Sequence, residues 1–487
     1  MNLSPAKQAS IIIAVSAIMH LLVAGNGGLG SDEAHYALYG YYLDWSYFDH
    51  PPLVGWLQAI ILNVSDSEFA LRLFPILIAI ATSVALYRLV QILFPNENVK
   101  LPLISVALFN LGIMFQLMGI SMLPEDPLLL LAILLLIFFL RALEDEKLTD
   151  WLVVGLFLGL AGLSKYTAVT LVVTMLLYLL WQQRLSVFQK PGIWVATLIA
   201  AVIISPVFYW NMNHDWISFT YQLDHGFKER PWSIKLFAAS QAAQFVVYTP
   251  GLYIASIAAL IAAWHERNHA SVQLLFLLVA PVFLLFAWGS GFQATLPHWT
   301  ALAWLGMTPL AARWMLFHWQ NRGVKILAWS IPVIGLPIII IIFSEFFSPW
   351  MPVPDNKHPF KQLYGWEKAA GRAIEIRDEL NSETTESERP AKLFVSNWSL
   401  ASRLAWYARP NAVFVTDRRL DQFDLWYGSA QDDDWGVLVM PIHSRMPKTN
   451  GQAQQFESCQ EKERMEYVTN GRILTTFIFY ICKKYHA

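Results

Sequence analysis

The sequence carries little charge for its length. Only 14% of its 487 residues are Asp, Glu, Lys or Arg, against about 25% in a soluble globular chain, and 56% are hydrophobic. The charge is also unevenly placed, because 36 of the 70 charged residues follow Trp350. A first part so poor in charge excludes a soluble enzyme, a disordered protein and a nucleic-acid binder with a basic face. The sequence therefore predicts an α-helical polytopic membrane protein with a soluble tail.

Several patterns typical of soluble metal or nucleotide sites are missing as well. The chain has no C-x-x-C pair, no H-x-x-E-H spacing and no P-loop that would cradle a nucleotide phosphate. Nucleotide hydrolysis is therefore not expected. The only two cysteines, Cys459 and Cys482, both lie in the tail. A disulfide, which an extracytoplasmic tail permits, and two buried free thiols fit equally well.

Spanning the hydrocarbon core of a membrane takes about 20 mostly apolar residues. The sequence has eleven candidate runs, roughly at 10–27, 71–94, 101–121, 127–143, 151–164, 166–182, 192–210, 237–263, 272–289, 299–316 and 324–343. The fifth and sixth are short, and only Ser164, Lys165 and Tyr166 separate them. They predict a hairpin of two short spans. The alternative is one long helix, which would place Lys165 at mid-bilayer. Every later loop would then lie on the opposite side of the membrane.

The Lys and Arg residues of the loops indicate which way the spans face, because cytoplasmic loops are richer in them. With the N-terminus in the cytoplasm, the inner set is Lys7, Arg88, Lys100, Arg141, Lys147, Arg184, Lys190, Arg267, Arg313, Arg322 and Lys325. The outer set is Arg72, Lys165, Lys228, Arg230 and Lys235. Segment 27–71 has neither Lys nor Arg, which favours the outside. We expect a retained signal anchor rather than a cleaved signal peptide at the first span, and a C-terminus outside.

The tail alternates between strand-like and helix-like stretches. Helices are expected near 363–380 and at 400–407, strands at 392–395, 413–416, 437–440 and 475–482, and a loop tip at 381–390. This alternation predicts a small α/β domain over 350–487. The transmembrane domain is then 1–349, with outer loops at 27–70, 121–127, 211–236 and 290–298.

Acidic residues beside membrane spans are costly and are functional candidates for that reason. Asp32 and Glu33 directly follow the first span, and Asp126 stands at the mouth of the fourth. For Asp126 the simpler interpretation is a helix cap, which does not exclude a chemical role. The aromatic residues of the first loop, Tyr47 among them, also fit an ordinary interfacial belt.

The other candidates are basic or aromatic, and they fall on the same predicted outer face. Lys165 either snorkels to the interface or neutralises a phosphate group there. The remaining candidates lie in three outer loops and are His50, His225, Lys228, His298 and Trp299. A transporter would need polar groups at the membrane midplane with access to both faces, and few are found.

Five of these segments, in order, resemble the GT-C glycosyltransferases that use a polyprenyl-phosphate sugar. The likeness is to bacterial relatives of protein O-mannosyltransferases and of lipid A aminoarabinose transferases. The matching segments are SDEAHYALYGYYLDWSYFDHPPLVGW (31–56), LPEDPLLL (123–130), GLSKYTAV (162–169), NMNHDWISFTYQLDHG (211–226) and LPHWTA (296–301). Two segments of the tail also match, SNWSLASRLAWYARP (396–410) and DLWYG (424–428). The resemblance therefore covers about 30–430.

The resemblance implies a role for each candidate. Asp32 matches the family's catalytic carboxylate, with Glu33 beside it and Asp126 as the acidic residue of the second loop. Lys165 matches a residue that holds the donor phosphate. Lys228, with His225 three residues before it, stands where the aminoarabinose transferases have an Arg for that phosphate. Those transferases have a Lys where this chain has His50 before Pro51-Pro52. We expect substrate contacts from Tyr47, His50, His298 and Trp299.

The leading hypothesis is therefore an inverting glycosyltransferase of the bacterial inner membrane. It would move a sugar from polyprenyl (undecaprenyl) phosphate to lipid A, a lipopolysaccharide glycan or a protein on the outer face, with no metal or other cofactor. The N-terminus would be cytoplasmic and the tail periplasmic. One alternative is a transporter or flippase of lipid-linked sugars, which would move the donor without consuming it. Another is a non-catalytic assembly protein whose tail binds a partner.

Overall fold

The computed structural model describes residues 3–226, 231–353, 357–383, 389–442 and 455–486, without the side chains of 224–226. Its contacts divide the chain into two units. The first unit, the membrane unit, comprises 1–24, 43–57 and 71–343. The second, the tail unit, comprises 25–42, 58–70 and 344–487. Parts of the first loop therefore belong to the tail unit, which is the property of the fold that matters most for the site.

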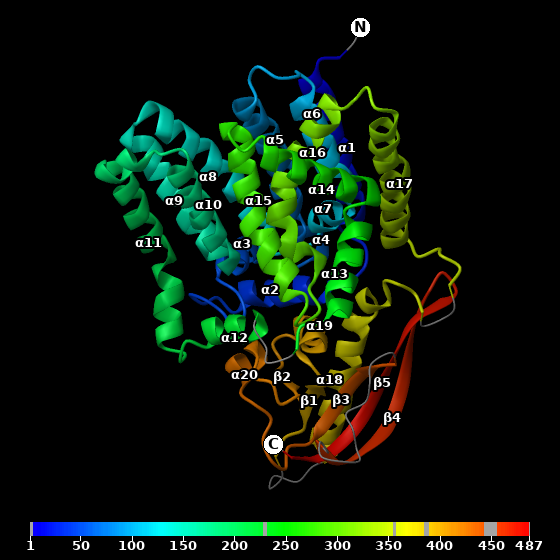
Figure 1. Cartoon of the computed structure of the whole chain (residues 1–487). Helices are drawn as coiled ribbons and strands as arrows, with labels where there is room; N and C mark the ends of the chain where they lie inside the picture. The colour runs from blue at the N-terminus through cyan, green and yellow to red at the C-terminus, as the bar shows by residue number, and fades with distance from the viewer. Residues whose placement is uncertain (1–2, 227–230, 354–356, 384–388, 443–454, 487) are drawn as a thin grey trace. The chain divides into compact units, whose positions relative to one another are not determined.

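The membrane unit is entirely helical (Figure 1). Its α-helices are α1 (Pro5–Val23), α5 (Leu73–Leu93), α6 (Leu101–Leu111), α7 (Ile113–Met118), α8 (Glu125–Asp145), α9 (Leu148–Ser164), α10 (Val169–Trp181), α11 (Pro191–Met212), α12 (Ile217–Gly226), α13 (Ile234–Val247), α14 (Pro250–His265), α15 (Ala270–Gly289), α16 (Ala301–Phe317) and most of α17 (Arg322–Phe347). Three short 3-10 helices are η1 (Tyr166–Ala168), η2 (Leu185–Gln189) and η3 (Pro297–Thr300). Helices α3 (Leu53–Leu62) and α4 (Glu68–Leu71) contain residues of both units.

Within the described residues, six helices are long and apolar enough to cross a membrane. They are Pro5–Val23, Glu68–Leu93, Glu125–Asp145, Pro191–Met212, Ala270–Gly289 and Arg322–Phe347. A seventh candidate is α13 with α14, which are bent by 111° at their junction. The chain is therefore a multi-pass membrane protein, as predicted. Each of the eleven predicted runs falls on a helix or helix pair, but several helices are too short to count as spans alone, so the number eleven stays a prediction.

The chain between α9 and α10 is interrupted at Lys165. The backbone of Lys165 is extended, with φ −155° and ψ 144°, and η1 follows before α10 begins. A single continuous helix over 151–182 is thereby excluded. The break leaves Lys165 at the end of one helix instead of in the middle of a longer one.

Helix α9 packs closely against α11 because glycines line the contact. A Cβ atom on Gly155 would lie 2.5 Å from the carbonyl oxygen of Ala196, and one on Gly159 would lie 2.7 Å from Cβ of Ile203. Small residues spaced in this way let two helix backbones approach inside a membrane. The approach fixes the end of α9, where Lys165 stands.

The tail unit contains a five-stranded mixed sheet in the order β2-β1-β3-β5-β4. The strands are β1 (Lys392–Val395), β2 (Val413–Val415), β3 (Gly436–Pro441), β4 (Phe456–Thr469) and β5 (Arg472–Tyr485). β1 is parallel to β2 and β3, whereas β5 is antiparallel to β3 and β4. The helices of this unit are α2 (Ser31–Tyr41), α18 (Trp366–Glu383), α19 (Trp398–Ala408) and α20 (Gln422–Tyr427).

The α/β tail domain is therefore confirmed, together with its four predicted strands and two predicted helices. Strand β4 and helix α20 were not predicted. Six of the 14 residues of β4 are charged and most of the strand is exposed. It lies at the sheet edge, where β5 is its only neighbour in the sheet. Of the predicted loop at 381–390, residues 384–388 lie outside the described part of the chain.

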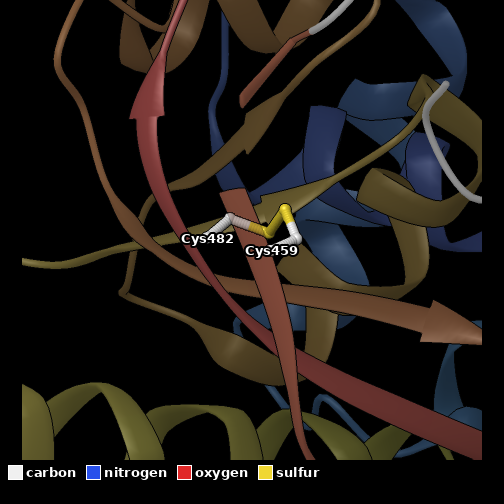
Figure 2. Close-up of a disulfide and its surroundings, with 2 residues drawn as sticks. All are labelled: Cys459 and Cys482. Atoms are coloured by element: carbon white, nitrogen blue, oxygen red, sulfur yellow. A yellow bond between two sulfur atoms is a disulfide. The ribbon is translucent and has the colours of Figure 1, made fainter. Parts of the chain in front are cut away.

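The two cysteines form a disulfide. Cys459 of β4 and Cys482 of β5 face each other in the ladder, with Cα atoms 4.1 Å apart, and Figure 2 shows their sulfur atoms joined. Of the two possibilities that the sequence leaves open, the structure has the disulfide. It ties the long outer hairpin of the sheet together near the chain's C-terminus.

Candidate active site

The most buried ionic contact of the membrane unit joins two helix ends. Nζ of Lys165 donates to Oε1 of Glu125, and the side chains are 9% and 3% exposed. Lys165 caps the C-terminal end of α9, and Glu125 opens α8. The snorkelling alternative for Lys165 does not apply, because its ammonium group is held inside the protein.

Local hydrogen bonds bring these two helix ends together. The hydroxyl of Ser164 donates to the carbonyl of Pro124 at 2.6 Å, which ties the end of α9 to the turn before α8. Oδ2 of Asp126 accepts from the backbone N–H of Leu123 at 2.7 Å. Asp126 therefore closes the turn from inside the first turn of α8, and not as the predicted N-cap before Pro127, because the helix already begins at Glu125. Its neighbour Glu125 is the carboxylate that contacts the lysine.

A histidine from η3 approaches the same carboxylate. Nε2 of His298 lies 3.7 Å from Oε1 of Glu125. Gln244 of α13 fixes η3, since its amide oxygen accepts from Thr300 and from the indole of Trp304, at 2.9 and 2.8 Å. Its amide nitrogen donates to the carbonyl of Pro297 at 3.3 Å. His298 is thus carried on a rigid turn.

The segment 43–52 supplies a second histidine. The charge of His50 acts on Glu125, and His50 also lies 4.0 Å from Asp49. Asp44 anchors the segment by accepting from the indole of Trp210 at 2.7 Å. Tyr47 is fully buried and its hydroxyl accepts from the N–H of Asp44 at 3.1 Å, so Tyr47 shapes the segment instead of offering a free ring.

We call the group of Glu125, Lys165, His50 and His298 the lysine cluster. It gathers up to three positive groups around one carboxylate. Burying an ammonium ion is costly unless an anion accompanies it, and here Glu125 is that anion. Nitrogen donors converging in this way also suit the oxygens of a phosphate group. The lysine cluster can therefore bind an anionic substrate group.

The tail unit holds the other predicted carboxylates, on the first turn of α2. Oε2 of Glu33 accepts from the N–H of Gly30 at 2.9 Å, so this carboxylate caps the helix. Asp32 is half-buried beside it, in a first turn where the helix dipole favours negative charge. The two adjacent carboxylates thus differ in their surroundings, and Asp32 is the one not committed to the cap.

Backbone contacts hold the start of α2. The N–H of Gly28 donates to the carbonyl of Leu363 at 2.9 Å, and that of Leu29 donates to the hydroxyl of Tyr407 at 3.0 Å. The same hydroxyl donates to Glu68 at 2.9 Å. A Cβ atom on Gly28 would lie 2.5 Å from the oxygen of Leu363, so glycine is required there. The helix that carries Asp32 is fixed by residues from the far end of the sequence.

Further along α2, His35 is enclosed by aromatic rings. Its Nδ1 lies 3.2 Å from the hydroxyl of Ser402 on α19. Five rings surround it with centroids between 4.9 and 6.0 Å, from Tyr36, Tyr39, Trp398, Phe423 and Trp426. This packing joins α2 to α19 and α20, which accounts for the helix being part of the tail unit.

Three of the predicted residues remain to be placed. His225 lies in α12, but its side chain and the whole of Lys228 fall outside the described residues. Trp299 is half-buried in η3, with its ring 6.0 Å from that of Phe286. Glu125, Tyr407 and Arg403, which the structure makes prominent, were not among the predicted site residues. Glu125 stands beside Asp126 in the sequence, and Arg403 and Tyr407 lie in the matching segment 396–410, but nothing local singled out any of the three.

One metal-type spacing also occurs in the chain. His265 to His269 has the pattern H-E-x-x-H, which binds zinc when both histidines share a helix face. Here α14 ends at His265, His269 precedes α15, and Glu266 is bonded to Arg313 at 2.6 Å. No group of three metal-ligand side chains is found among the residues that the structure describes. The spacing is therefore not a zinc site of that kind.

The membrane unit thus carries a buried cationic cluster, and the tail unit carries Asp32 on α2. Comparison with known proteins confirms the resemblance. The family model described as dolichyl-phosphate-mannose-protein mannosyltransferase matches residues 49–210. The chain is therefore similar to the GT-C membrane glycosyltransferases, and the family match itself covers residues 49–210.

Individual relatives agree with this. The chain is 24% identical over 398 residues to lipid A galacturonosyltransferase RgtD of Rhizobium johnstonii, covering 78% of this chain and 80% of that protein. The crystal structure of ArnT from Cupriavidus metallidurans bound to undecaprenyl phosphate superposes with a TM-score of 0.60 at 11% identity, covering 96% of this chain and 97% of that one. The apo oligosaccharyltransferase of Archaeoglobus fulgidus gives 0.50 at 12% identity, over 82% and 64%. The two structures show the shared fold.

Proposed function

We propose that this chain transfers a sugar from a polyprenyl-phosphate donor to lipid A, or to a closely related glycolipid, on the outer face of a bacterial inner membrane. The observation that carries the proposal is the buried pair of Lys165 and Glu125, with His298 on the same carboxylate. The relatives support the substrates, since one is named as a lipid A galacturonosyltransferase and another was solved with undecaprenyl phosphate bound.

The lysine cluster is proposed to bind the donor phosphate. Leaving-group phosphate needs its developing charge stabilised, and a prearranged ammonium in low-dielectric surroundings does this well. Glu125 holds Lys165 and His298 in place until the donor arrives. His225 and Lys228 are proposed to contact the same phosphate, as the resemblance implies.

Asp32 is proposed to be the general base. The acceptor hydroxyl oxygen attacks the anomeric carbon, the bond from that carbon to the phosphate oxygen breaks, and its electron pair leaves with polyprenyl phosphate. The carboxylate of Asp32 takes the hydroxyl proton. A single direct displacement inverts the anomeric configuration. The step balances without a metal ion, so none is included.

The acceptor side is proposed to involve His50 and Trp299. The aminoarabinose transferases have a Lys at the position of His50, so this chain is expected to accept a differently charged glycolipid. Tyr47 is proposed to hold segment 43–52, where its hydroxyl accepts from Asp44, in addition to the predicted substrate contact.

The proposed topology places the N-terminus in the cytoplasm and the tail in the periplasm. The disulfide of Cys459 and Cys482 supports the second point, since disulfides persist in oxidising compartments and are rare in the cytosol. The basic residues of the short loops support the first.

The test uses purified protein in detergent with a panel of radiolabelled polyprenyl-phosphate sugars. Release of polyprenyl phosphate is followed with and without a lipid A extract, for the wild type, for Asp32→Asn and for Asp215→Asn as a control at an exposed outer-loop carboxylate. We expect release that requires both the extract and Asp32. Transfer by Asp32→Asn at the wild-type rate would disprove the base assignment. In proteoliposomes, movement of intact donor without cleavage would instead indicate a transporter.

A further inference from the structure

Helix α19 of the tail packs along α2, the helix that carries Asp32. The hydrogen bonds lie at the start of α2 and in its N-terminal half. Tyr407 of α19 binds the N–H of Leu29 just before α2, and Ser402 contacts His35 one turn further on. Any charged residue on this face of α19 therefore acts on the first turn of α2.

Arg403 is such a residue, and it is nearly inaccessible at 2% exposed. Its Nε donates to the carbonyl of Ser399 at 3.2 Å, and its Nη1 donates to the carbonyl of Gln362 at 2.8 Å. Its guanidinium lies over the indole of Trp366, 4.8 Å from the ring centroid. These contacts fix the plane of the guanidinium, but they are all neutral and leave its positive charge in place.

The charge that acts on Arg403 is that of Asp32. Burial lowers the pKa of Arg403 to about 10, and the negative charge of Asp32 opposes this fall. The attraction is mutual, because a cation that is stabilised by a carboxylate stabilises that carboxylate in its ionised form. An arginine is well suited to the task, since it keeps its charge in surroundings where lysine would lose it.

We infer that Arg403 is a positioning residue for Asp32. The buried cation of α19 keeps the carboxylate ionised and the first turn of α2 in place, so the tail domain takes part in catalysis through Asp32. The inference rests on the proposed function, in which Asp32 is the general base.

The other ionisable groups around this end of α2 within the tail unit are of both signs. Glu33 caps the helix, Glu68 accepts from Tyr407, and Asp421 and His35 interact one turn further along. Lys361 stands one residue before Gln362, whose carbonyl Arg403 binds. Among these groups Arg403 is the buried cation that attracts the charge of Asp32, so its removal is expected to favour the protonated form of Asp32.

The test compares Arg403→Gln and Arg403→Lys with Arg409→Gln in the full-length protein. Arg409 is a matched control, because it ends the same helix, stacks on Trp406 at 3.4 Å and pairs with Asp66 at 3.3 Å. We expect Arg403→Gln to move the acidic limb of the transfer pH profile upward by about one unit, a roughly tenfold loss at the foot of the limb. Arg403→Lys should recover part of the shift, and Arg409→Gln should leave the limb unchanged.

A double-mutant cycle on melting temperature gives a readout independent of transfer. Arg403→Gln and Asp32→Asn should be non-additive, because the second change removes the charge on which Arg403 acts. If Arg403→Gln does not fold, the cycle is run with Arg403→Lys. Additive melting shifts, or an unchanged pH limb in an active Arg403→Gln protein, would overturn the inference. Absence of transfer by the wild type would instead count against the proposed function, while the cycle would still decide the coupling.

Discussion

Lys165 and Glu125, 40 residues apart in the sequence, form an ion pair in which both side chains are almost wholly buried. Such a pair adds little stability over a well-packed apolar pair, yet breaking it leaves an uncompensated charge inside the protein. A buried pair at two helix ends, beside His298, is better explained by binding chemistry than by folding. Variants of Lys165 and Glu125 separate a role in binding from a role in folding.

Lys165→Met should destabilise the protein by about 3–5 kcal/mol, because the buried carboxylate of Glu125 loses its directly bonded cation and keeps only the histidines nearby. Adding Glu125→Gln should restore most of the melting temperature and none of the transfer activity. Melting in detergent and release of polyprenyl phosphate measure the two effects separately. If the double variant regained transfer along with stability, Lys165 would have only a structural role.

Asp32→Asn and Glu33→Gln should differ in their effect on transfer. Asn cannot take a proton, so a loss of about 10²–10⁴-fold is expected at position 32 in a protein that still folds. Gln retains an oxygen that accepts from Gly30, so position 33 should lose about tenfold or less, with stability lowered by about 1 kcal/mol. A larger loss at Glu33 than at Asp32 would reverse the assignment of the base.

Stability of the tail unit should fall as the pH rises from 4 to 7. Burial raises the pKa of Asp421 from 3.8 to about 7, so in this window the folded state holds a proton that the unfolded state has released. At about 1.4 kcal/mol per pKa unit the full effect is at most a few kcal/mol. Melting temperatures of the wild type should fall across the window and level off above it.

Asp421→Asn is expected to flatten this dependence and to keep the helix cap, because Asn caps as well as Asp and can accept from the N–H of Phe423. Asp433→Asn, at an exposed position with positive φ that Asn tolerates, is the control and should behave as the wild type. Equal slopes for all three proteins would show that another group causes the decline.

Reducing the disulfide of Cys459 and Cys482 should destabilise the tail unit by about 3 kcal/mol, as expected for a bridge closing a loop of this length. Protein purified from the inner-membrane fraction should show the bridge when its peptides are mapped without reduction. Expression in a strain lacking periplasmic disulfide formation should leave two free thiols. Free thiols in the normal strain would contradict both the bridge and the proposed side of the tail.

Gly159→Ala should loosen the contact between α9 and α11. The new methyl group would lie 2.7 Å from Cβ of Ile203, and overpacking of this kind costs about 1–3 kcal/mol. The control is Gly371→Ala on α18, where a Cβ atom meets nothing within 4 Å and helix propensity favours Ala by up to about 1 kcal/mol. Melting temperatures should therefore move in opposite directions.

Much of the fold followed from patterns that are local in the sequence. Apolar runs marked most helices of the membrane unit, but not α12, which lies in the predicted outer loop 211–236. Short apolar stretches marked β1, β2, β3 and β5. β4 was not predicted, because many of its residues are charged and exposed at the sheet edge and it has no such stretch. The break at Lys165 was also predictable, since a polar residue interrupts two apolar stretches.

The sequence predicted several residues of the candidate site, but not which side chains contact one another. Position beside a span identified Asp32, Lys165 and His298. Position alone did not distinguish Glu125 from Asp126, because two adjacent residues differ only in the direction in which their side chains leave the helix. Arg403 was beyond reach of the sequence alone, since its importance comes from packing against residues nearly 400 positions earlier.

The hydrogen bond from Leu29 to Tyr407 joins residues 378 positions apart. Ribosomes make the first segment long before the second, so α2 is synthesised before the surface on which it packs. The helix that carries Asp32 acquires its partners only after nearly the whole polypeptide has been translated and the tail has folded. A nascent or truncated chain thus holds its acidic helix unassembled, and the completed protein is the earliest form in which that helix is in place.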